Sequence, residues 1–296
     1  MKIGMTLPSM AGGLDRPTLL EWCRRIDEGP FSTLAVGERI AYPNVELFTT
    51  LAAAAAVTER VRLMSTIVVL PAHPAIEVAT MAATIDVISD GRLTLGVGVG
   101  GRDEDYRALE RSDARRHQVL DAQVATMRRV WAGDEPEPGM HPVGPAPVQA
   151  GGPPLFSGAL CPKSTARSAR WAQGVAGFLL DPLTADVGRT FRRIESAWVD
   201  AGRTDAPTHV TSFWCALGPD GPARLHRYAV DYLAIFGDDI ASAMADGCTA
   251  HSAAAVRDAI ARLAAAGCDE LLLVPTTVDL DELDALAELA SVAAGG

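Results

Sequence analysis

Eight short apolar segments recur along the 296-residue chain, separated by longer segments with the spacing of amphipathic helices. The apolar segments are 2–7, 33–36, 61–70, 93–99, 154–157, 175–180, 209–217 and 270–274. Their apolar residues are continuous and do not alternate with polar ones, which is typical of parallel strands buried on both faces. Eight such strands alternating with helices predict an α/β fold, a single (β/α)8 barrel over residues 1–296.

Two segments interrupt this alternation. Residues 134–153 contain six of the 19 prolines and predict a long connection before the fifth strand. Residues 222–266, between the seventh and eighth strands, hold more helical sequence than one crossover requires. We expect both to be excursions from one domain.

Composition excludes several classes of protein. The 26 basic and 37 acidic residues give a net charge of −11, which argues against nucleic-acid binding. The longest apolar run, residues 51–57, is too short to cross a bilayer, and no export signal is visible. The five scattered cysteines are typical of reduced thiols in a cytoplasmic protein, and neither they nor the six histidines have metal-ligand spacing. We therefore expect a cytoplasmic protein without metal, membrane or nucleic acid.

In a barrel of this kind the active site forms where the strands end at their carboxyl termini. There the segment Gly96-Val97-Gly98-Val99-Gly100-Gly101 matches the spacing of a dinucleotide fingerprint, but it follows the fourth strand and precedes an acidic run. It could instead keep a strand slim for packing inside the barrel. We favour a third interpretation, in which glycines at every second position leave one strand face bare for a flat ring.

The turn after the fifth strand is a candidate phosphate site. Gly158 and Ala159 precede a helix that begins near Pro162, where Lys163 and Ser164 could help free N–H groups to bind an anion. An ordinary helix N-terminus has the same sequence, and the residues alone leave the two interpretations equal.

Glu38 and Arg39 are an adjacent pair of opposite charges at the end of the second strand. Glu38 could orient Arg39, which could then stabilise developing negative charge on a substrate. The alternative is an exposed ion pair of little energetic consequence. Their place at the barrel mouth favours a catalytic role. Of the histidines, His73 alone falls near this mouth, and the sequence contains no G-x-S-x-G elbow for covalent hydrolysis.

Three stretches of sequence resemble the bacterial luciferase-like oxidoreductases, and most closely those that use the deazaflavin coenzyme F-420. They are 62–74 (Arg62-Leu63 through Ile67-Val68-Val69-Leu70-Pro71-Ala72-His73-Pro74), 82–92 (Ala82 to Arg92) and 95–100 (Leu95 to Gly100). The start of the chain through Pro8, residues 31–39 and the ending 267–275 add to the likeness.

The resemblance implies a barrel that binds F-420, or alternatively FMN, at the carboxyl ends of its strands, usually as a homodimer. It implies a non-prolyl cis peptide at Thr66–Ile67 behind the ring, and a cofactor phosphate at Gly158, Ala159 and Ser164. Pro8, Ser65, Gly98, Gly100, Gly101 and Lys163 complete the cofactor-binding residues that we expect.

The chain departs from parts of that family. It has Arg39 where luciferase and the sugar-phosphate dehydrogenases have an active-site histidine, Gly101 where the dehydrogenases have a glutamate, and Val99 where luciferase has a phosphate-binding arginine. Light emission and sugar-phosphate oxidation are therefore not expected. Asp181, at the end of the sixth strand, would repel a nearby phosphate.

Three hypotheses follow. The first is hydride transfer between F-420 and a small organic substrate. The second is an FMN-dependent monooxygenase of the same fold, and the third a flavin-binding protein without catalysis, because the sequence shows no strong acid–base pair.

Overall fold

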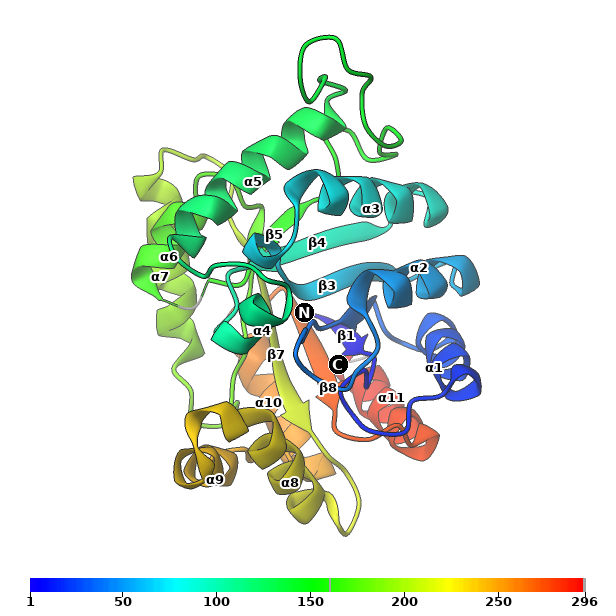
Figure 1. The fold of residues 1–296 in the computed structure, drawn as a ribbon. Coiled ribbons are helices and arrows are strands. Elements are labelled where there is room, and N and C mark those ends of the chain that lie inside the picture. The colour runs from blue at the N-terminus through cyan, green and yellow to red at the C-terminus, as the bar shows by residue number, and fades with distance from the viewer. Residues whose placement is uncertain (160, 295–296) are drawn as a thin grey trace.

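The computed structural model describes residues 1–159 and 161–294. Eight parallel strands pair in sequence order, and the last pairs with the first, so the sheet closes into a barrel (Figure 1). The strands are β1 (Lys2–Thr6), β2 (Thr33–Val36), β3 (Arg62–Val69), β4 (Leu93–Gly98), β5 (Leu155–Ser157), β6 (Gly174–Ala176), β7 (Thr208–Cys215) and β8 (Glu270–Pro275). The predicted (β/α)8 barrel is confirmed.

Every predicted strand overlaps an observed one, and the largest difference is at β6. The prediction ran from 175 to 180, whereas β6 ends at Ala176. Beyond it the chain stays beside β7, since the N–H groups of Gly177 and Leu179 each donate to a β7 carbonyl at 2.8 Å. An isolated parallel bridge between Leu179 and Phe213 also lies there, outside the regular ladder.

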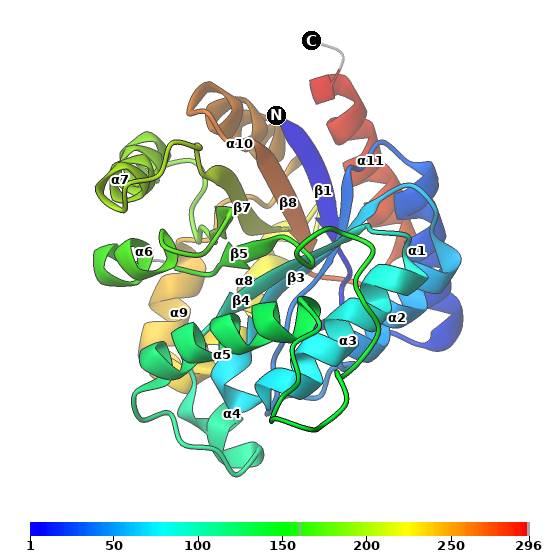
Figure 2. The same ribbon diagram turned by 90° about the horizontal axis from the view of Figure 1, so that it is seen from above.

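Helices surround the barrel, as the view from above shows (Figure 2). Those of the repeating pattern are α1 (Arg16–Glu28), α2 (Leu47–Val57), α3 (Ala75–Ile88), α5 (Arg116–Trp131), α6 (Pro162–Ser168), α7 (Val187–Asp200), α10 (Ala253–Ala265) and α11 (Leu280–Ala294). Additional short helices are η1 (Leu70–Ala72), α4 (Asp103–Ala108), α8 (Gly221–Leu233), η2 (Ala234–Phe236) and α9 (Asp238–Asp246).

Apolar residues at helical spacing form the buried face of α5. In α5, Leu120, Val124, Met127 and Trp131 are buried at spacings of three or four residues. Trp131 also donates its indole N–H to the carbonyl of Ala79 on α3 at 3.0 Å. The outer helices are thus fixed to the barrel by one apolar stripe each.

The two excursions lie at opposite ends of the molecule (Figure 1). Residues 134–153 form a loop without helix or strand, beyond the carboxyl end of α5. By contrast, α8, η2 and α9 follow the carboxyl end of β7 and so stand at the barrel mouth, where α4 also lies. Their apolar residues pack on Trp214 and Ala216 of the β7 end as a separate small cluster. Nothing in the composition of residues 222–266 indicates this second cluster, and the assignment of residues 1–296 to one domain stays a prediction.

Within the described residues no helix is both long and apolar enough to cross a membrane. All five cysteines are free thiols; Cys161 is exposed and the other four are buried.

Candidate active site

The end of β3 is irregular where it meets β4. The peptide bond between Thr66 and Ile67 is cis, as predicted, and the register of β3 on β4 shifts between Ser65 and Val68. Ser65 is fully buried and donates its hydroxyl to the carbonyl of Gly96 at 2.9 Å. It therefore joins the two strands and does not face a cavity.

The glycines of β4 make room for this irregular segment. A Cβ on Gly96 would stand 2.2 Å from the carbonyl oxygen of Ser65, and one on Gly98 would stand 2.3 Å from Cδ1 of Ile67. Gly158, after β5, also contacts Ile67, with 3.2 Å between its ideal Cβ and Cγ2 of Ile67. The bare face predicted for the glycine string is thus covered in part by the Ile67 side chain, which together with Gly98 and Gly158 forms one wall of a cavity.

That cavity has a volume of about 480 Å³ and opens at the carboxyl ends of the strands. Ligand cavities commonly measure about 300–1,000 Å³, so it is large enough for a cofactor. The predicted cofactor residues that line it are Thr66, Ile67, Gly98, Gly100, Gly101, Gly158, Ala159 and Ser164. Pro8, Ser65 and Lys163 do not line it.

At one end the cavity is lined by α6 and α5. Ser164, Ser168 and Trp171 recur every three or four residues and turn one face toward the cavity. Lys163 lies about 100° around the helix from Ser164, is exposed to solvent and does not line the cavity, and its role in holding a cofactor phosphate stays a prediction. The cation that reaches the cavity from α6 is Arg167, which the sequence argument missed.

Arg167 already has partners. Its guanidinium pairs with Asp121 of α5 and donates to the carbonyl of His117 at 2.8 Å. The indole of Trp171 also donates to Asp121, at 3.3 Å. The expected free N–H of Gly158 is likewise in use, because it donates to the carbonyl of Val97 at 2.9 Å. An anion bound here would therefore share Arg167 with a carboxylate.

Asp181 lies apart from this end of the cavity. Its carboxylate accepts hydrogen bonds from the hydroxyl groups of Thr184 and Thr249 and from the N–H of Leu183. Burial would raise the pKa of Asp181, but these hydrogen bonds outweigh it and hold the pKa below its ordinary value. Because Asp181 does not line the cavity, the expected repulsion of a phosphate does not arise there.

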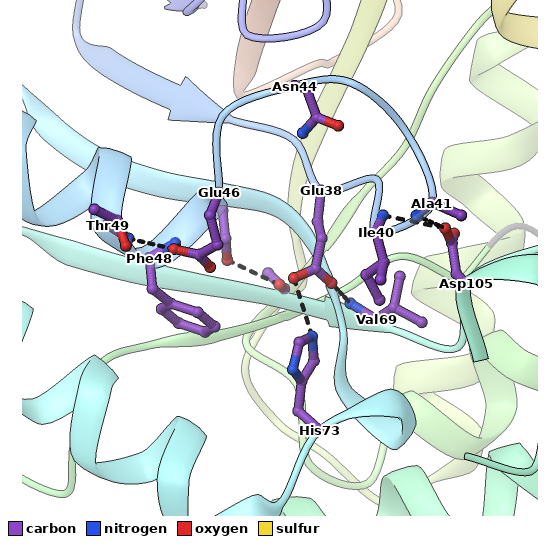
Figure 3. Close-up of polar contacts among 12 residues, drawn as sticks. Glu38, Ile40, Ala41, Asn44, Glu46, Phe48, Thr49, Val69, His73 and Asp105 are labelled. Carbon is purple, nitrogen blue, oxygen red and sulfur yellow. Dashed lines mark hydrogen bonds and ion pairs between the residues drawn. The ribbon is translucent and has the colours of Figure 1, made fainter. Parts of the chain in front are cut away.

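Glu38 does not orient Arg39. Its carboxylate accepts a hydrogen bond from the N–H of Val69 at 2.6 Å and lies 3.0 Å from Nε2 of His73, so it ties the end of β2 to the end of β3 (Figure 3). Neighbouring residues in an extended chain point to opposite sides, which separates Glu38 from Arg39. The expected pair is therefore wrong, and His73 is the partner that the sequence argument left unassigned.

The loop that follows Glu38 is held by two further carboxylates (Figure 3). Asp105 accepts from the N–H groups of Ile40 and Ala41, at 3.1 and 2.8 Å. Glu46 caps α2 by accepting from the N–H groups of Phe48 and Thr49. The loop from 37 to 46 is thus fixed to both α4 and α2.

Arg39 is buried, with 8% of its surface exposed, so the alternative of an exposed ion pair is also wrong. It donates to Glu104 at 3.1 Å, and its guanidinium carbon lies 4.1 Å from the ring centre of Tyr42 and 5.0 Å from that of Tyr232. Arg102 lies over Tyr232 as well, at 4.6 Å. Arg39 lines neither of the cavities at the mouth; its contacts place Tyr232.

Tyr232 stands between the large cavity and a second one of about 100 Å³. The second cavity is walled by aromatic rings that touch one another. Phe178, Tyr228 and Tyr232 each contact Trp214 edge to face, with ring centres 4.7, 5.6 and 4.9 Å apart. Burial raises the pKa of both tyrosines, so they are neutral phenols at physiological pH.

Sequence reasoning missed these aromatic residues and the part of the cavity that is lined by α5, Arg167 and Trp171. The spacing of Tyr228 and Tyr232, four residues apart, indicates one face of a helix. It carries no information on where that face points. Among the described residues no group of three or more His, Cys, Asp or Glu side chains is placed to hold a metal ion.

Comparison with known proteins gives the family. The model of a family described as luciferase-like monooxygenase matches residues 1–253. An uncharacterized protein of Mycobacterium tuberculosis is 29% identical over 165 residues, which cover 53% of this chain and 57% of that protein. The match thus spans little more than half the length of the curated relative.

Solved structures show the same fold over nearly the whole chain. The monooxygenase RslO1 from Streptomyces bottropensis superposes with a TM-score of 0.76 at 24% identity, covering 98% of both chains. An F-420-dependent secondary alcohol dehydrogenase, solved with an adduct of F-420 and acetone, superposes with a TM-score of 0.76 at 17% identity, covering 97% of both. With the family model spanning most of the sequence, the chain belongs to the luciferase-like monooxygenase family.

Proposed function

We propose that this protein is an oxidoreductase that transfers hydride between the deazaflavin coenzyme F-420 and a small organic substrate. The observation that carries the proposal is the wall of the large cavity formed by Ile67, Gly98 and Gly158. No side chain projects from β4 or from the β5 turn at Gly98 and Gly158, so a flat ring can lie against the Ile67 side chain and the backbone.

The residues present fit such a cofactor. The ring would rest on Ile67, Gly98 and Gly158, and a phosphate would lie toward Ser164 and Arg167 at the α6 end. When bound, a deazaflavin supplies hydride transfer at carbon 5 of its ring, whereas reduced FMN supplies oxygen activation. The protein contributes position, a wall that excludes water, and the local positive charge of Arg167.

The charge at the α6 end favours F-420 over FMN. Arg167 is already paired with Asp121, and Val99 stands where luciferase has a phosphate-binding arginine. A phosphodiester, as in F-420, carries one negative charge. The terminal phosphate of FMN carries about 1.5 to 2 at pH 7, since its second pKa is near 6. Arg167, whose charge is partly neutralised by Asp121, suits the single charge of the phosphodiester better than the larger charge of the terminal phosphate.

The alternative is an FMN-dependent monooxygenase. The similar structures include a protein named as a monooxygenase and one named as F-420-dependent, so the fold is compatible with both chemistries. A flavin-binding protein without catalysis is the third possibility, since among the described residues Tyr232 is the only titratable side chain that lines both cavities. A cytoplasmic location is part of the proposal and rests on the unpaired cysteines.

The test is to incubate the purified chain with each cofactor and remove unbound cofactor by gel filtration. We expect retained absorbance at about 420 nm, marking the deazaflavin, rather than at about 450 nm, marking FMN. Retention of FMN alone would select the monooxygenase. Retention of F-420 without exchange of hydride with any alcohol or ketone tried would favour the non-catalytic protein.

A further inference from the structure

The smaller cavity is built at the ends of four strands that the cofactor wall does not use. Thr6 and Leu7 come from β1 and the turn after it, Gly37 follows β2, and Trp214 and Val274 belong to β7 and β8. The cavity shares four lining residues with the larger one, namely Thr66, Phe178, Ser212 and Tyr232. A molecule in it would therefore lie next to a ring held in the larger cavity.

The lining carries no charge. None of the residues around the smaller cavity is Asp, Glu, Lys, Arg or His, and its two tyrosines are neutral. An ion entering it would lose its hydration without gaining a partner, which is strongly unfavourable. Cations meet a further obstacle, because the guanidinium groups of Arg39 and Arg102 both lie over Tyr232. The cavity selects neutral molecules.

The shape selects a single ring or a group of that size. Phe178, Trp214, Tyr228 and Tyr232 supply aromatic walls, and such rings pack well edge to face or offset against another ring. An engineered protein cavity of about 150 Å³ holds benzene. At about 100 Å³, with an opening into the larger cavity, this one takes no more than one ring at its inner end.

One buried polar atom in this lining has no partner. Thr6 is 5% exposed, and its hydroxyl makes no hydrogen bond to any described residue. The hydroxyl of Ser212, by contrast, is used, since it donates to the carbonyl of Gly177 at 3.0 Å. A buried hydroxyl without a partner is costly, and a ligand or ordered water commonly satisfies it.

We propose that the smaller cavity is the substrate site, and that it takes a small uncharged ring compound whose carbonyl or hydroxyl oxygen hydrogen-bonds to Thr6. The proposal rests on the proposed function, because it is the neighbouring cofactor that makes this cavity a substrate site. The aromatic walls bind the ring, and the hydroxyl of Thr6 hydrogen-bonds to the oxygen of the substrate.

Binding can be measured on the full chain as purified, with three probes of similar size. Acetophenone carries a ring and a carbonyl, toluene lacks the oxygen, and benzoate carries a charge. In titrations followed by ligand-observed NMR we expect acetophenone to bind about 3- to 10-fold more tightly than toluene, the value of one hydrogen bond. We expect benzoate to bind more weakly than either.

Variants of Thr6 distinguish the contribution of its hydroxyl group to binding from the contribution of the cavity's shape. Thr6→Val removes the hydroxyl at nearly constant volume. The affinity for acetophenone should therefore fall about 3- to 10-fold, while the affinity for toluene should stay within about twofold of the wild type. Thr6→Ser keeps the hydroxyl and should keep the preference for acetophenone. Thr211→Val is the matched control, since Thr211 is equally buried on β7 but lines neither cavity, and it should change neither affinity.

Equal affinities of the wild type for acetophenone and toluene would overturn the proposal, and this comparison needs no variant to fold. A Thr6→Val protein that binds acetophenone as the wild type does would also overturn it, and would assign the hydroxyl to ordered water. Benzoate binding as tightly as acetophenone would refute the selection of neutral molecules. Because no probe measurement uses a cofactor, a chain that binds acetophenone but retains neither F-420 nor FMN would contradict the proposed function; the cavity would then be a ligand site for neutral rings and not a substrate site.

Discussion

The side chain of Ile67 occupies the place that a side chain at Gly98 would need, with only 2.3 Å between Cδ1 of Ile67 and an ideal Cβ on residue 98. The two residues come from β3 and β4 and together form the wall on which we place the cofactor ring. The glycine is therefore required for the position of its neighbour, and the pair can be tested directly.

We expect Gly98→Ala to weaken cofactor binding by about tenfold, because the new methyl group pushes the end of Ile67 into the space of the ring. The fold should survive, since the displaced atom is the tip of a flexible side chain. Gly101→Ala is the control; it lines the same cavity but its ideal Cβ meets nothing within 4 Å. Fluorescence titration with F-420 and FMN measures both. Equal dissociation constants for the two variants would place the ring elsewhere.

Asp121 sets the charge available to a phosphate. Replacing it with asparagine frees Arg167 from its carboxylate, so a phosphate-bearing cofactor should bind about 3- to 10-fold more tightly. The gain should shrink at high salt, because screening weakens the attraction. Lys163→Gln should leave affinity unchanged, since Lys163 does not line the cavity. Tighter binding in neither salt condition would mean that the phosphate does not contact Arg167.

Substitutions of Arg39 distinguish a structural role, which would change the free energy of unfolding, from a catalytic role, which would change turnover. If it places Tyr232, Arg39→Ala should lower the free energy of unfolding by about 2–4 kcal/mol, because the change removes two cation–π contacts and the ion pair with Glu104. Urea unfolding measures this effect. If Arg39 instead stabilises charge on a substrate, Arg39→Lys should fold normally and lose about 100-fold in turnover. We expect the first result, with turnover of Arg39→Lys within about tenfold of the wild type.

The pair of Glu38 and His73 makes stability depend on pH. Burial would lower the pKa of His73, but the hydrogen bond to Glu38 and the charges of Glu38, Glu46 and Glu77 outweigh it and raise the pKa above the ordinary 6.5. The stabilisation that protonated His73 gains from Glu38 is therefore complete below pH 6.5. It is lost as the pH rises through the higher pKa that His73 has in the folded protein.

Relative to His73→Gln, the wild type should be more stable by about 1–2 kcal/mol near pH 5.5, and this advantage should decline near pH 8.5. Melting temperatures of both proteins across this range provide the measurement. A difference that does not change with pH would show that the pKa of His73 is the same in the folded and the unfolded protein and would contradict the prediction.

The homodimer stays a prediction. The exposed residues of the adjacent helices α2 and α3 include Ile76, Val87 and Ile88, and Glu77 is their one charge among the described residues. We expect light scattering to give twice the mass of the chain and Ile88→Glu to give the monomer mass. A Glu77→Gln control should remain dimeric, and a wild type of 31.1 kDa in solution would refute the dimer.

The sequence predicted the barrel because each apolar run and each helical stripe is a local pattern with a physical period. The wall around Ile67 and Gly98 followed from spacing and from the family likeness together. Glu38 and Arg39 could not be placed, because adjacency in sequence says nothing about which sides two residues face. Closeness to the helix start points to Lys163 and not to Arg167, whereas the side of the helix decides which cation reaches the cavity.

Tyr228 and Tyr232 belong to α8, outside the eightfold alternation, yet they wall the smaller cavity. Part of the surface proposed for the substrate is thus encoded outside the strands and turns that carry Ile67, Gly98 and Gly158. Substitutions in α8 can reshape that part without disturbing a strand or the residues beneath the ring. Drift in this single appended helix can therefore change the shape of the smaller cavity while the wall formed by Ile67, Gly98 and Gly158 stays the same.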